Sequence, residues 1–441
     1  MPYDLAYHVA LDGNGLNGLE GLAGVCLFRY DSASDAYAFK IVYYEGVAAG
    51  HAVMINPAGT IGYLGNAGQH LLFYDARTLE ERARISTLRF EQSDSTLRGS
   101  THLVWLDDWS VLTPVGAYFY RFDVRNLRKG ERVAEHSVKI PHGMKRSASG
   151  RYVLYGAMDH PTLGEAREVG IFDLKTGAVR RVPMPTTCWH VIPHPRDDRF
   201  YAVSFRVHPD ERGSYHEWAI AYFKEYAYEI DARSGEIVRH WSAGRQIPAH
   251  INSDMAISQK ELIFCNGASH SIVFIDLASF AAFRLIDERP GPEILMTKTR
   301  ELQSQITEVF ARQSFFQSTH RYAAAYIVSR GAVLDSIYGC QLSSNERLLF
   351  TANRGLNHIT IYNYPENTVR LRVDMPPIQN FCPWLQLSDD PRLGFHHSAL
   401  LDERRGASAT ARSRQGTAAR PARAAESSEE SHRRPKIRRR K

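Results

Sequence analysis

The sequence lacks the signals of several large protein classes. Its apolar runs fall well short of the roughly 20 residues needed to cross a bilayer, and its first residues, MPYDLAYHVALDG, contain no basic segment followed by an apolar core. The GxSxG, GK[ST], HExxH and glycine-rich dinucleotide motifs are also missing, which removes support for serine hydrolases, nucleotide-binding proteins and Rossmann dehydrogenases. We therefore expect no membrane span and no standard secretion signal.

Cysteine is scarce, and its spacing suits neither disulfides nor a zinc ribbon. The five residues are odd in number, scattered and without CxxC spacing; they are Cys26, Cys188, Cys265, Cys340 and Cys382. A reducing compartment fits this pattern, so the expected location is the cytoplasm.

The positive charge is confined to one end of the chain. The net charge is +6, but residues 402–441 alone hold 13 Lys/Arg and five Asp/Glu, which leaves the rest at −2. This end is rich in Ala, Ser and Arg and cannot bury a core, so we expect a disordered tail over 402–441 and a folded domain over 1–401. A nucleic-acid partner is expected only through this tail.

One short pattern recurs along the folded part: an apolar stretch that ends in Asp or Asn, followed by a turn and a second β-like stretch. Most neighbouring copies lie 44 to 58 residues apart, close to the length of one propeller blade. The seven copies end at Asp31, Asp75, Asp123, Asp173, Asp231, Asp276 and Asn363.

A second pair of β-like stretches precedes most copies, as in HAVMINPAGTIGYL and CQLSSNERLLF. The first copy has no such pair before it, whereas CPWLQLSDDPRLGF near the other end has nothing after it. Joining these ends in one blade removes exposed sheet edges. The expected fold class is therefore all-β, a seven-bladed β-propeller with one split closing blade.

An insertion interrupts the repeats between Asp276 and Asn363. Leu302, Ile306, Val309 and Phe310 follow helical spacing, so we expect an inserted helical segment at about 290–330 that either caps the ring or packs on its flank.

Three blades carry a family resemblance. LFTANRGLNHITIYN (349–363), IFCNGASHSIVFID (263–276) and GYLGNAGQHLLFYD (62–75) are similar to the YVTN-type repeat of lactonase-like seven-bladed propellers. The resemblance implies turn roles for Asn66, Asn266 and Asn353. It does not fix an activity, since this superfamily includes lactonases, cycloisomerases, dehydrogenase subunits and a copper reductase.

Histidine recurs where the blades begin. Aligned by first strands, five blades share this residue type, at His51, His102, His142, His190 and His250; Cys340 takes the position in a sixth blade, and Pro383 or Trp384 in the split blade. Innermost strands line the propeller axis, so these side chains should converge there.

Several neutral imidazoles with few carboxylates suit a transition metal, with iron favoured over copper or zinc. We expect His102, His142, His190 and His250 as the metal ligands and His51 as a free acid or base. Asp159 and Asp254 are the carboxylates expected to assist catalysis or orient a histidine.

The leading functional hypothesis is a metal-dependent oxidoreductase or oxygenase that acts on an apolar small molecule. Seven-bladed carotenoid cleavage oxygenases are similar in chemistry because they hold iron with four axial histidines, although the histidine spacing here differs from theirs. The alternatives are a non-redox lyase, cyclase, isomerase or lactonase that uses the same histidines, and a non-catalytic interaction propeller.

Overall fold

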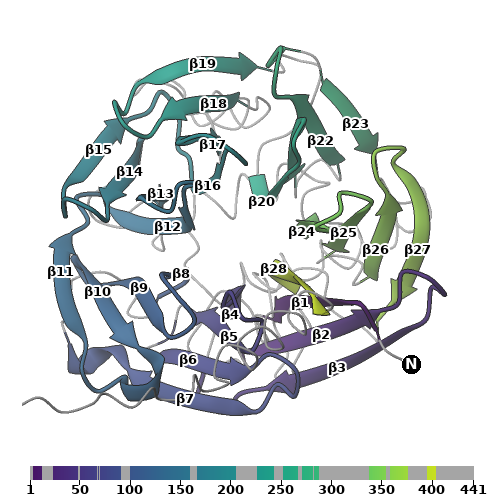
Figure 1. Cartoon of the computed structure of the whole chain (residues 1–441), viewed down its shortest axis with the longest axis horizontal. Coiled ribbons are helices and arrows are strands. Elements are labelled where there is room, and N and C mark those ends of the chain that lie inside the picture. Colours follow the sequence, from purple (N-terminus) through teal and green to yellow (C-terminus); the bar gives the residue numbers. More distant parts are fainter. Residues whose placement is uncertain are drawn as a thin grey trace, which may run out of the picture.

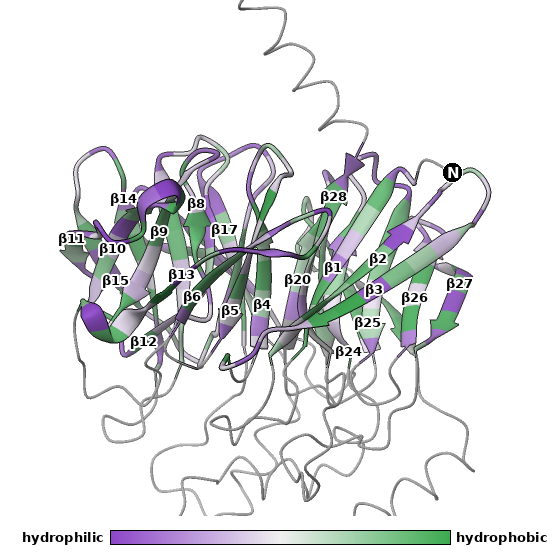
Figure 2. Cartoon of the chain, turned by 90° about the horizontal axis from the view of Figure 1, so that it is seen from below, coloured by the Kyte–Doolittle hydropathy of each residue, from purple (hydrophilic) through white to green (hydrophobic). Residues whose placement is uncertain are grey.

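The computed structural model describes residues 3–11, 23–47, 50–66, 68, 70–90, 100–158, 166–204, 226–242, 252–266, 271–281, 283–287, 337–353, 358–375 and 395–403. These residues form seven antiparallel sheets of four strands each. The sheets are arranged around a central axis (Figure 1), and their strands run between the two faces of the ring (Figure 2). The predicted seven-bladed all-β propeller is confirmed.

Six blades use four consecutive strands, numbered from the axis outwards. Blades 2 to 4 are β4 (Gly50–Ile55), β5 (Ile61–Asn66), β6 (His70–Asp75), β7 (Glu81–Ser86); β8 (Val104–Trp105), β9 (Ser110–Val115), β10 (Tyr118–Asp123), β11 (Glu131–Glu135); and β12 (Ile140–Arg146), β13 (Tyr152–Met158), β14 (Glu168–Asp173), β15 (Val179–Pro183). Blades 5 to 7 are β16 (His190–Pro193), β17 (Arg199–Val203), β18 (Tyr226–Asp231), β19 (Ile237–Ser242); β20 (Asn252–Ile257), β21 (Glu261–Asn266), β22 (Ser271–Asp276), β23 (Phe283–Asp287); and β24 (Ile337–Leu342), β25 (Leu348–Asn353), β26 (His358–Asn363), β27 (Thr368–Asp374).

Blade 1 joins the two ends of the described chain. Its inner strand β28 (Phe395–Asp402) pairs with β1 (Leu5–Leu11), which is followed by β2 (Gly24–Tyr30) and β3 (Tyr37–Tyr43). The split blade is therefore confirmed, but its expected two-plus-two division is wrong, because three strands come from the N-terminal side. Every residue of β1, LAYHVAL, is buried. Because both faces of this strand are covered, its sequence does not alternate between apolar and polar residues, the pattern by which a strand is usually recognised.

The recurring Asp or Asn ends or directly follows the third strand of each blade. Asp75, Asp123, Asp173 and Asp231 each accept the backbone N–H two residues later. Such side-chain bonds hold the turn toward the outer strand, which explains why this residue type repeats.

An apolar core lies between each pair of neighbouring blades. The described residues contain seven such clusters, and the cluster that unites Tyr7 and Phe28 of blade 1 with Phe350 of blade 7 closes the ring. The blades are thus held together mainly by aromatic and aliphatic packing between their faces.

Polar contacts at the rim reinforce these cores. Arginines on outer strands donate to backbone carbonyls of the next blade, as Arg239 does to Leu277 and Arg370 does to Ser32.

The helices in the described part of the chain are the short 3₁₀ segments Thr87–Arg89 and Val124–Asn126, and none has the length and apolarity of a membrane-crossing helix. The helical segment expected at about 290–330 and nearly all of the expected tail lie outside the described residues.

Buried His8 makes the fold sensitive to acid. It lies in β1 at 0% exposure, and burial lowers its pKa to about 3. The folded chain therefore keeps this imidazole neutral, whereas the unfolded chain protonates it below about pH 6.5. The free energy of unfolding should consequently fall as the pH decreases from about 6.5 toward 3.

We predict that His8→Asn reduces this pH dependence by up to about 1.4 kcal/mol per pH unit. The measurement is urea unfolding at several pH values between 7 and 4, with His240→Asn on the exposed side of β19 as the control. Equal slopes for the wild type and His8→Asn would contradict the assignment.

Candidate metal centre

The inner strands carry β-bulges close to the axis. In β4 the register with β5 shifts between Gly50 and Ala52, on either side of His51. Similar shifts occur in β12, β20, β24 and in the pairing of β28 with β1. A bulge bends its strand and redirects side chains, and here it recurs where the blades approach one another.

Three of the predicted histidines come together from three different blades. His51 lies in β4, His102 just before β8, and His142 in β12, and their ligating nitrogens all lie within 4.8 Å of one another. The ring centroids are 5.3 Å apart for His51 and His102, 4.8 Å for His51 and His142, and 4.3 Å for His102 and His142. His51 therefore lies among the closest three, although we expected it to act as an acid or base and not as a ligand.

Backbone contacts orient the His142 ring. Its Nδ1 is 3.1 Å from the Trp189 carbonyl oxygen, which can only accept, so Nδ1 carries the proton. The Nε2 lone pair then points to His51, whose Nε2 is 2.6 Å away. Two imidazole nitrogens that share a tetrahedral ion at about 2.1 Å stand about 3.4 Å apart, so a small outward movement of the rings would admit an ion.

Burial keeps His102 and His142 in the neutral form that binds metal. It lowers the pKa of His142 to about 3, and it places that of His102 well below its usual value, helped by the neighbouring His142, His51 and His190. A neutral imidazole offers a lone pair at neutral pH without first losing a proton.

Two further histidines extend the cluster around the axis. His190, at the start of β16, has its ring centroid 4.8 Å from that of His142. His397 in β28 lies 4.6 Å from His190 and 4.8 Å from His51. His397 was missed because the closing strand was sought at Pro383 or Trp384, which lie outside the described residues.

The remaining predicted residues have mixed outcomes. His250 and Asp159 lie outside the described residues. Cys340 is buried in β24, where its backbone N–H donates to Asp254 at 3.0 Å.

Asp254 links three blades rather than facing the axis alone. One carboxylate oxygen accepts from the backbone of Met255 at 2.9 Å, and the other from Cys340 and from the Ser398 hydroxyl at 3.2 Å. The same carboxylate lies 3.9 Å from Nδ1 of His397. Burial raises its pKa to about 6, an effect that nearby Lys145 and these donors oppose. These contacts favour Asp254 as a positioning residue that fixes β28 and His397.

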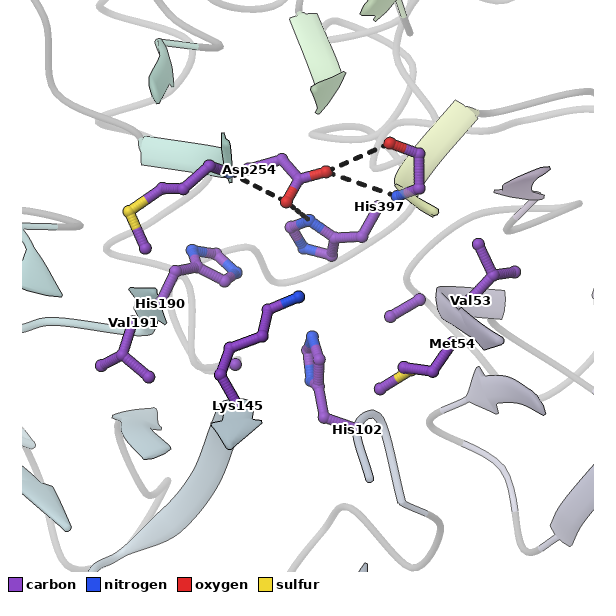
Figure 3. A pocket seen from close by; sticks show the side chains of 12 residues that line it. Val53, Met54, His102, Lys145, His190, Val191, Asp254 and His397 are labelled. Carbon is purple, nitrogen blue, oxygen red and sulfur yellow. Dashed lines mark hydrogen bonds and ion pairs between the residues drawn. The ribbon is translucent and has the colours of Figure 1, made fainter. Parts of the chain in front are cut away.

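A cavity of about 20 Å³ opens beside the histidines. Figure 3 shows His102, His190 and His397 around it, with the Lys145 side chain pointing between them. Lys145 was not singled out from the sequence, because its spacing from His142 places it on the opposite face of a regular strand.

Replacement of Asp254 tests its positioning role. In Asp254→Asn an amide N–H₂ replaces one acceptor and leaves a buried donor unpaired, so we expect a loss of about 1–3 kcal/mol of stability at pH 7.5. Urea unfolding provides the measurement, and Asp374→Asn at an exposed position of β27 provides the control. Unchanged stability of Asp254→Asn would contradict the positioning role.

Comparisons with known proteins add little about identity. No protein-family model matches the chain, and no curated protein matches it, so the YVTN-type resemblance stays a prediction. Among solved structures, the chain is similar to dihydro-heme d1 dehydrogenase NirN in complex with DHE. The two share 11% identity with a TM-score of 0.49, over 92% of this chain and 76% of the other. At this level the similarity says nothing about activity or ligands.

Proposed function

We propose that this protein is a metal-dependent enzyme that holds one transition-metal ion on the propeller axis through His51, His102 and His142. The observation that carries the proposal is the convergence of three ligating nitrogens within 4.8 Å from three separate blades. Blade faces are held together by apolar packing, so a stable ring has no need of imidazoles at this place.

The donor set favours a catalytic rather than a structural ion. Structural sites commonly have four protein ligands, whereas three ligands leave a coordination position open for water or substrate. The adjacent cavity has space for about one water-sized group. His190 and His397 stand beside this position, where either serves as an additional ligand or as a proton carrier.

The favoured class is an oxidoreductase or oxygenase acting on an apolar small molecule. Imidazoles suit iron, copper and zinc, and iron is our first choice, with dioxygen chemistry as the activity it would supply. Apolar side chains line part of the cavity, namely Ala52, Val53, Met54, Val191 and Met255, which suits an apolar substrate.

In the proposed centre, neighbouring residues orient the histidines. The Trp189 carbonyl fixes the His142 tautomer, so that Nε2 stays available as a ligand. Asp254 holds β28 and thereby sets the position of His397.

Elemental analysis of protein purified without a metal-affinity tag tests the proposal. We predict about one equivalent of metal in the wild type and its loss in His51→Ala, His102→Ala and His142→Ala, since each removes one of the three proposed core ligands. His240→Ala, on the outer strand β19, is the matched control and should keep the metal.

The identity of the ion decides the reaction class. Iron or copper supports the redox assignment and directs substrate screening to apolar compounds with oxygen present. Zinc supports the non-redox alternative, a lyase, cyclase, isomerase or lactonase. Absence of any metal, even after anaerobic reconstitution of folded protein, would overturn the metal centre and leave imidazole acid–base catalysis or an interaction propeller.

A further inference from the structure

A lysine shares the axial cavity with the histidines because of a bulge in β12. His142 pairs with Gly156 and Lys145 pairs with Leu154, so three steps along β12 match two along β13. Paired residues of neighbouring strands point to the same side, and Gly156 and Leu154 are two apart on one side of β13. The bulge therefore brings His142 and Lys145 to the same side, although they are three residues apart.

The bulge depends on Gly143. This residue has φ of +55°, and a Cβ there would lie 2.6 Å from the Trp189 carbonyl oxygen. Only glycine accepts both this backbone conformation and this close approach. Within the sequence HGMK, Gly143 and Lys145 line the cavity, and His142 belongs to the adjacent histidine cluster.

Lys145 is half-buried and has no bonded anion in the described part of the chain. Among the residues that line the cavity, no hydrogen bond or ion pair reaches its ammonium (Figure 3). It lies close enough to contribute electrostatically to the lowered pKa of His102 and to oppose the rise that burial causes in the pKa of Asp254. Asp254 does not neutralise it by direct contact, because its oxygens accept from Met255, Cys340 and Ser398.

This environment suits a negatively charged ligand. An ammonium has three donors and no acceptor, and partial burial without an acceptor is unfavourable. The titratable groups that line the cavity with it are His102, His190, His397 and Asp254. Asp254 is the one carboxylate among them, and its hydrogen-bond donors already compensate its charge.

We infer that Lys145 binds a carboxylate, and that the substrate of the proposed enzyme is an apolar molecule with one acid group whose charged end enters this cavity. The inference rests on the proposed function for the reaction, but the anion site itself does not require the metal. The cavity volume of about 20 Å³ admits one small group and not a whole organic molecule. The same chemistry would also accept a small free carboxylate.

The test uses ¹³C-labelled formate and octanoate as probes, with NMR line widths as the measure of binding. Wild-type protein is titrated as purified and after metal removal by a chelator. Lys145→Met removes the positive charge but keeps a side chain of similar length, whereas Lys145→Arg keeps the charge. As a control, Lys129→Met removes the charge of an exposed lysine. Metal content and thermal unfolding of each variant are measured in parallel.

We expect Lys145→Met to weaken binding about tenfold or more, because a charge-assisted bond is lost, while Lys145→Arg and Lys129→Met retain it. Tighter binding of octanoate supports an acid-bearing substrate, and binding of formate alone supports a small free anion. Equal affinities for wild type and folded Lys145→Met would overturn the inference. A protein that binds carboxylate through Lys145 but holds no metal would instead overturn only the proposed function.

Discussion

The antiparallel pairing of β28 with β1 is the contact on which the rest of the molecule depends. It joins strands almost 400 residues apart and converts a row of six blades into a closed ring. Without it, β1 would expose a buried apolar strand with an unpaired edge, and the core between blades 1 and 7 would lose one wall. The same pairing brings His397 into the axial cluster, so closure of the fold and completion of the cluster are one event.

The axial region combines groups that are costly to bury individually. Neutral imidazoles, one carboxylate and one ammonium lie together, and hydrogen bonds with backbone groups compensate part of the desolvation of His142 and Asp254. The Tyr7 hydroxyl bonds to Ser398, which in turn bonds to Asp254, so a polar chain runs from blade 1 to blade 6. This network fixes β28, the strand that presents His397.

Sequence patterns predicted the architecture well because each blade repeats the same physical solution. The Asp at the end of the third strand accepts a hydrogen bond from its own turn, as Asp75 and Asp173 do. The spacing between successive copies of this Asp therefore equals the length of one blade. The histidine column was visible for a related reason, since inner strands occupy equivalent places around one axis. His51, His102 and His142 could therefore be grouped before any geometry was known.

The unpredicted features arise from local irregularity and from long-range closure. β1 lacks alternation because both of its faces are buried, and overlooking it displaced the closing strand and concealed His397. Lys145 faces the cavity only because a bulge shifts the register by one residue, which no periodic rule anticipates. The several bonds of Asp254 depend on residues from two distant blades, so its linking role could not be read from its neighbours in sequence.

Each axial histidine belongs to a different blade, and this has a mechanical consequence. Their separations are set by the circumference of the ring, which is in turn the sum of all contacts between neighbouring blades. A slight loosening anywhere on the rim, even between blades that contribute no ligand, widens the axis and changes every nitrogen-to-nitrogen distance at once. The affinity of the proposed centre for an ion would then depend on the packing between all seven blades.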